Sequence, residues 1–73
     1  MQSNLQTEVA AVARELAALR LEAEDARLAV GLSTTFLVLQ AQRDLAAAET
    51  NELQAALDRR MALVDFELAQ VAP

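Results

Sequence analysis

The chain of 73 residues contains no cysteine, histidine, lysine, tryptophan or tyrosine. Without cysteine there is no disulfide framework, no thiolate nucleophile and no zinc knuckle. Without histidine, the commonest transition-metal ligand and the usual general base are also missing. Six arginines stand against eleven acidic residues, and the net charge of −5 argues against nucleic acid and anionic membrane surfaces as partners. We therefore expect no catalytic residues, no metal site, no cofactor and no nucleic-acid partner.

Glycine and proline occur once each, and the proline is the last residue. Alanine and leucine together fill 30 of the 73 positions. Glutamate, glutamine and arginine, which are also strong helix formers, fill a further 19 positions. A chain this short holds at most one small domain. The composition therefore predicts an all-α fold, and the residue pattern divides it into two long helices around one break.

In the first half, apolar residues follow one another at alternating steps of four and three, which is the heptad pattern of a helix with a single apolar seam. The members of this row are Leu5, Val9, Val12, Leu16, Leu19, Ala23, Ala26 and Val30. Leu21 and Leu28 lie off the row, which suggests a second contact face on the same helix.

The break lies at the only glycine. Gly31 follows the last residue of the apolar row, where a left-handed C-cap is expected. Ser33, Thr34 and Thr35 come next, and one of these hydroxyls is expected to cap a second helix. The sequence therefore predicts one antiparallel helical hairpin over residues 1–73, with a helix over 4–30, a turn over 31–35 and a helix over 36–71.

The second helix carries two apolar rows. Alanines recur in strict heptad register at positions 41, 48, 55, 62 and 69, which favours close helix–helix packing. The second row consists of Leu and Val after one alanine: Ala46, Leu53, Leu57, Val64, Leu68 and Val71. A helix that is apolar on two faces needs two neighbours, and a hairpin supplies one. We therefore expect the hairpin to belong to a larger helical assembly, and by itself to associate as a dimer or higher oligomer, most simply a four-helix bundle of two hairpins.

The charged residues point to solvated surfaces. Glu8, Glu15 and Glu22 are spaced by seven, so they form a stripe on one helix face without the pocket that acid–base chemistry needs. Opposite charges at helical spacing occur only around Glu24, with Arg20 and Arg27. Because so few favourable pairs are present, the helices must be held mainly by packing. The longest uncharged stretch, residues 28–42, is too short and too polar to span a bilayer.

Residues 27–46 read RLAVGLSTTFLVLQAQRDLA, and residues 62–69 read ALVDFELA. This pattern resembles the TolC-like outer-membrane efflux proteins. In that family a long periplasmic helix ends in a V-G-L/T tip, and the returning helix begins with a pattern like S/T-x-x-x-V-L-D/Q-A-Q-R-x-L. The similarity covers roughly residues 10–72, and the combined pattern is far more specific than the VGL triplet by itself.

The resemblance implies a place and a partner. Members of the family are trimers from Gram-negative bacteria, with a long α-helical tunnel through the periplasm. Their hairpin tips dock onto a periplasmic adaptor (membrane fusion) protein and, through it, an inner-membrane pump. The corresponding tip residues here are Val30, Gly31, Leu32, Ser33 and Thr34. The segment itself is then expected to make no membrane contact. Carboxylates that ring the tunnel entrance in some members correspond here to Leu37 and Gln40, so this hairpin supplies no acidic ring.

Two other interpretations remain open at this point. One is a free-standing coiled-coil hairpin that serves as a self-associating scaffold module. The other is the hairpin of an adaptor rather than of a duct, although adaptor tips resemble R-L-x(6)-L-x(3)-R/S more than V-G-L. An enzyme ranks below both, since the hydroxyl side chains have no histidine or lysine to activate them.

Overall fold

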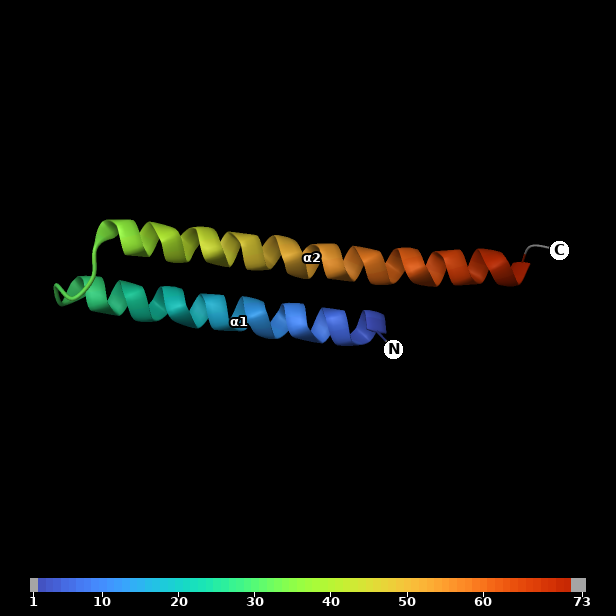
Figure 1. Cartoon of the computed structure of the whole chain (residues 1–73), viewed down its shortest axis with the longest axis horizontal. Helices are drawn as coiled ribbons and strands as arrows, with labels where there is room; N and C mark the ends of the chain where they lie inside the picture. Colours follow the sequence, from blue (N-terminus) through green and yellow to red (C-terminus); the bar gives the residue numbers. More distant parts are fainter. Residues whose placement is uncertain (1, 72–73) are drawn as a thin grey trace.

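The protein is a two-helix antiparallel hairpin (Figure 1). A computed structural model describes residues 2–71, with helix α1 over Gln2–Ala29 and helix α2 over Thr35–Val71. The hairpin is long and thin, with principal extents of 66 × 17 × 11 Å. These findings confirm the all-α hairpin class. The helices expected over 4–30 and 36–71 correspond to α1 and α2, while Met1, Ala72 and Pro73 lie outside the described residues.

The two helices meet along a seam of small side chains. Ala17 on α1 and Val38 on α2 are its buried members, with exposed fractions of 8% and 7%. Around them, half-buried residues recur at steps of three and four, which is the spacing of a coiled-coil contact. They are Thr7, Ala10, Ala11, Arg14, Ala18, Leu21 and Glu24 on α1, and Ala41, Leu45, Ala48, Glu52 and Ala55 on α2. Alanine is the commonest residue of the seam, so small side chains lie between the two helices over much of its length.

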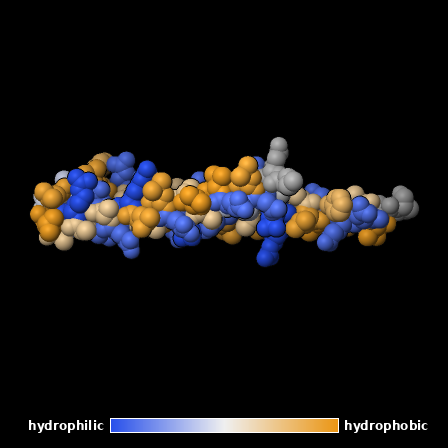
Figure 2. All heavy atoms as spheres, turned by 90° about the horizontal axis from the view of Figure 1, so that it is seen from below, coloured by the Kyte–Doolittle hydropathy of each residue, from blue (hydrophilic) through white to orange (hydrophobic). Residues whose placement is uncertain are grey.

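The row of large apolar residues on α1 does not form this seam. Leu5, Val12 and Leu19 are 60%, 64% and 60% exposed, because the row lies on the side of α1 opposite α2. The side with Leu21, which the sequence suggests as a second contact face, is the one that meets α2. Seen from the α1 side, apolar side chains recur along the surface with hydrophilic ones beside them (Figure 2). The heptad pattern therefore identifies an apolar face correctly, but that face has no partner within the hairpin.

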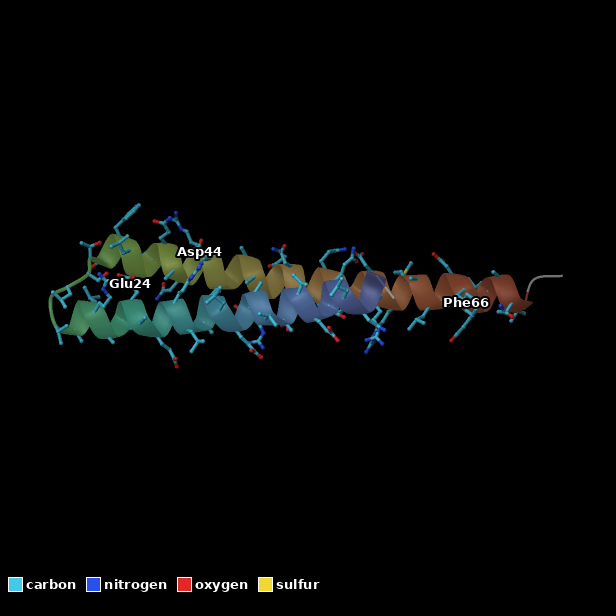
Figure 3. The ribbon with its side chains drawn as sticks, turned by 60° about the horizontal axis from the view of Figure 1, so that its bottom comes forward. Glu24, Asp44 and Phe66 are labelled. Carbon is cyan, nitrogen blue, oxygen red and sulfur yellow. The ribbon has the colours of Figure 1, made fainter. Side chains whose placement is uncertain are left out.

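Helix α2 extends well past the start of α1 (Figure 1). It has 37 residues against 28 in α1, and every residue from 56 to 71 is exposed. Phe66 lies on this overhang and projects from α2 where no part of α1 runs beside it (Figure 3). The alanine heptad divides accordingly: positions 41, 48 and 55 are half-buried against α1, whereas Ala62 and Ala69 are exposed. The predicted close packing thus holds for three of the five alanines.

One ion pair joins the helices in their middle. Arg14 Nε lies 2.9 Å from Glu52 Oε1, and each side chain is about one-third exposed. Both residues occupy the seam, so the pair replaces an apolar contact there with a charged one. Within residues 2–71 neither helix contains a stretch both long and apolar enough to cross a membrane.

Candidate interaction site at the hairpin tip

The end of α1 is fixed by backbone hydrogen bonds around Gly31. The N–H of Leu32 donates to the carbonyl of Arg27 at 2.7 Å, and the N–H of Gly31 donates to the carbonyl of Leu28 at 3.0 Å. This pair of bonds is the Schellman motif, which requires a left-handed residue just after the helix. Gly31 has φ of +77°, so the expected glycine C-cap is confirmed. The helix end is therefore closed without any side-chain donor.

The start of α2 is capped by one of the three hydroxyl residues. The N–H of Leu37 donates to Thr34 Oγ1 at 3.2 Å, and the N–H of Val38 donates to the Thr34 carbonyl at 3.1 Å. Thr34 is therefore the N-cap, three residues before the N–H that its side chain accepts. With a cap on each side, the turn has a defined path from α1 to α2.

A second hydroxyl contact ties the turn to α1. Ser33 is half-buried, and its hydroxyl donates a hydrogen bond to Glu24 Oε1. Glu24 lies near the turn end of α1 (Figure 3). The sequence suggests Arg20 and Arg27 as partners of Glu24, but neither arginine forms an ion pair with it in the described part of the chain. Sequence spacing carries no signal for the Ser33 contact, because it crosses the turn rather than following one helix.

The tip presents apolar side chains to solvent. Val30 and Leu32 are 69% and 68% exposed, although the backbone between them is held in place. Phe36, in the first turn of α2, is 69% exposed beside them in the sequence and was not among the predicted tip residues. The sequence does indicate Phe36 as a candidate tip residue, because it is one of only two aromatic residues and lies two positions after the N-cap. Val38, by contrast, is turned inward and buried.

Of the five predicted tip residues, the structure brings all into one turn but gives them different roles. Val30 and Leu32 are outward side chains, and Gly31 permits the backbone path. The Ser33 hydroxyl donates a hydrogen bond to Glu24 on α1, and the Thr34 hydroxyl accepts one from the N–H of Leu37 on α2. A partner at this site would therefore meet apolar side chains, while the polar groups maintain the shape that holds them.

Two open grooves lie between the helices, one of them near the tip. Near the tip, a shallow groove between the helices is lined by charged residues that include Arg20, Glu24, Arg27 and Asp44. The second groove lies near the start of α1 and is lined by Thr7 and by residues of α2 between positions 49 and 63. Within residues 2–71, no three acidic side chains are placed to hold a metal ion. The stripe of Glu8, Glu15 and Glu22 is exposed along its length.

Comparison with known proteins gives no match: no protein-family model fits the chain, and neither a curated protein nor a solved structure matches it.

Proposed function

We propose that this hairpin is a wall segment of a TolC-like efflux duct, which lines the periplasmic tunnel and docks the periplasmic adaptor through its tip. The observation that carries the proposal is the pattern of residues 27–46, which resembles that family, at a hairpin turn whose apolar residues are exposed. In this view the chain is a structural and binding element rather than an enzyme. Its location is the periplasmic part of an outer-membrane protein.

The exposed faces of both helices support the wall role. Leu16 and Leu19 on α1, and Leu53 and Leu57 on α2, are all roughly half exposed or more, although they are large aliphatic residues. A helix in a closed barrel has a neighbour on each side, so each helix of a wall hairpin needs one apolar face for its own partner and another for the next hairpin. Burial of such a side chain contributes about 1.5–3 kcal/mol. The neighbours would therefore supply stability that this hairpin lacks.

The tip supports the docking role. Val30 and Leu32 are held by a turn whose backbone is already ordered, so binding would cost little additional conformational entropy. A contact of two or three apolar side chains is weak by itself. Several tips arranged around one duct would act together, and linked weak contacts gain strength through their effective concentration.

The most direct test reads the coding sequence on either side of these 73 residues. The proposal expects further long helical segments, including a second hairpin with a tip of the same kind. A reading frame that stops at both ends of the chain would overturn it. That outcome would favour the free-standing scaffold, the second candidate, which the exposed apolar faces of α1 and α2 also support.

The tip assignment is tested separately in the full-length protein. Leu32→Asp places a charge on the exposed tip without touching the seam, and we expect it to abolish export while the trimer persists. Asn51→Asp is the matched control, because Asn51 is exposed on α2 away from the turn. Export that is equally normal in both variants would refute docking through Leu32.

A further inference from the structure

The outer face of α1 has the composition of a coiled-coil seam. In heptad terms its a positions are Val9, Leu16 and Ala23, its d positions are Leu5, Val12, Leu19 and Ala26, and Val30 continues the row into the turn. The row covers nearly four heptads, the length at which a sustained heptad pattern indicates a coiled coil. The face is exposed over its whole length and turned away from α2.

The flanks of this face carry opposite charges. Glu8, Glu15 and Glu22 occupy the g positions on one side. Arg20 and Arg27 occupy e positions on the other side. Within residues 2–71 neither arginine forms an ion pair, and Glu15 has only a 4.0 Å contact with Arg14. Charges at e and g set the partner and the orientation in coiled coils.

We propose that a second copy of this chain covers the outer face of α1, with the two α1 helices parallel and in register. In a parallel pair, each g residue faces the e residue five positions later in the partner. Glu15 then faces Arg20 of the partner subunit, and Glu22 faces Arg27 of the partner subunit. The symmetry of the pair repeats both contacts, so four Glu–Arg pairs flank the apolar seam.

The opposite orientation is disfavoured by the same charges. In an antiparallel pair, g residues face g residues, so the three glutamates of one helix lie against the three of the other. Like charges at these positions are destabilising. A pairing of α1 with the outer face of α2 also lacks complementarity. On the outer face of α2, the positions that would lie opposite the glutamates of α1 are Gln42, Glu49 and Ala56. No positive charge therefore faces those glutamates.

This inference does not rest on the proposed function. In a duct wall a neighbouring hairpin of different sequence would cover the outer face of α1, so the parallel pair describes the chain where its only available partner is a second copy of itself. Its a and d residues suit two strands moderately well, because valine at a and leucine at d favour parallel dimers. Ala23 and Ala26 weaken the seam near the tip.

Disulfide trapping tests the orientation, and it is clean because the chain has no cysteine of its own. Ala26→Cys places one thiol at a d position near the tip, where only a parallel, in-register pair brings it beside its own copy. Ala47→Cys is the control, because Ala47 is exposed on α2. We expect Ala26→Cys to cross-link at least about tenfold faster under mild oxidation, given the high effective concentration within a dimer. Equal rates in a chain that sediments as a dimer would overturn the parallel pairing.

Charge exchange tests the flanks. The double variant Glu15→Arg and Glu22→Arg places arginine opposite arginine, and Arg20→Glu with Arg27→Glu places glutamate opposite glutamate. Because attraction becomes repulsion at all four flanking pairs, either variant should raise the dimer dissociation constant by about tenfold or more in sedimentation equilibrium. An equimolar mixture of the two variants should regain the parent affinity. A parent chain that remains monomeric at high micromolar concentration, or variants that associate as well as the parent, would refute the proposal.

Discussion

The hydroxyl of Ser33 donates a hydrogen bond to the carboxylate of Glu24, and this contact joins the turn to α1 across nine positions of sequence. It fixes the last residues before α2 against the helix that precedes them. The contact also occupies Glu24, which sequence spacing would assign to Arg20 or Arg27. The tip is therefore held by two side-chain contacts, this one and the Thr34 cap, in addition to the backbone bonds around Gly31.

Removing the Ser33 hydroxyl should destabilise the hairpin. We expect Ser33→Ala to lower the free energy of unfolding by about 1 kcal/mol, since the Glu24 carboxylate loses a partner in a partly buried place. Urea denaturation followed by circular dichroism, at one fixed protein concentration, measures the loss. Thr35→Ala is the control, because Thr35 is exposed and has no such contact with α1. Equal losses in both variants would show that the hydrogen bond between Ser33 and Glu24 makes no specific contribution to stability.

The ion pair between Arg14 and Glu52 should make a modest contribution. The two side chains are about one-third exposed, so solvent screens their attraction. A double-mutant cycle with Arg14→Gln and Glu52→Gln is expected to give a coupling energy of about 0.5–1 kcal/mol, falling as salt is added. The exposed carboxylate Glu67, on the overhang of α2, supplies the control pair with Arg14 and should give a coupling near zero. A coupling that does not respond to salt would contradict the electrostatic origin.

Gly31 should resist substitution because of its backbone angle rather than its surroundings. A Cβ placed there meets no atom within 4 Å, yet φ of +77° is disfavoured for residues with a side chain. We expect Gly31→Ala to cost about 1–2 kcal/mol, and Gly31→Asn to cost less, because asparagine tolerates the left-handed region better. Thermal unfolding measures both. A more stable Gly31→Ala chain with increased helical signal would indicate that the turn has been lost and the two helices have merged into one rod.

The alanine seam should not accept larger side chains. Ala48 is half-buried against α1, while its neighbour Ala47 is exposed. Ala48→Leu is therefore expected to force the helices apart and cost about 1–3 kcal/mol. Ala47→Leu should change the free energy of unfolding by no more than about 0.5 kcal/mol. If Ala48→Leu stabilised the hairpin instead, the space between the helices would be larger than the alanine register indicates.

Much of the fold could be predicted because the apolar spacing and the single glycine both indicate two helices joined by one turn. The alanine heptad at 41, 48 and 55 marked a real contact, and Gly31 marked the end of α1. The partner of each apolar face could not be predicted, because periodicity gives the direction of a face relative to its own helix but not relative to another. The row through Leu16 and Leu19 therefore looked like the seam, although it lies on the far side of α1.

At the tip, likewise, the local features could be predicted from the sequence and the contacts between separate segments could not. The cap could be narrowed to three hydroxyls, since the residue types and their place after Gly31 are local features. Which hydroxyl became the cap depended on the path of the turn, and that path left Ser33 to bond Glu24. The exposure of Phe36 followed from the same path, because it depends on how α2 leaves the turn and on which side then faces α1.

From the closed turn at Gly31 we also expect a definite order of folding. The contact of Ser33 with Glu24 closes a short loop, whereas that of Arg14 with Glu52 closes a much longer one. Loop-closure entropy rises with the length of the loop, and local contacts form fastest. Contacts should therefore form first at the turn and spread toward the free ends of the helices. Substitutions at the turn are then expected to slow folding, and those at Arg14 to speed unfolding.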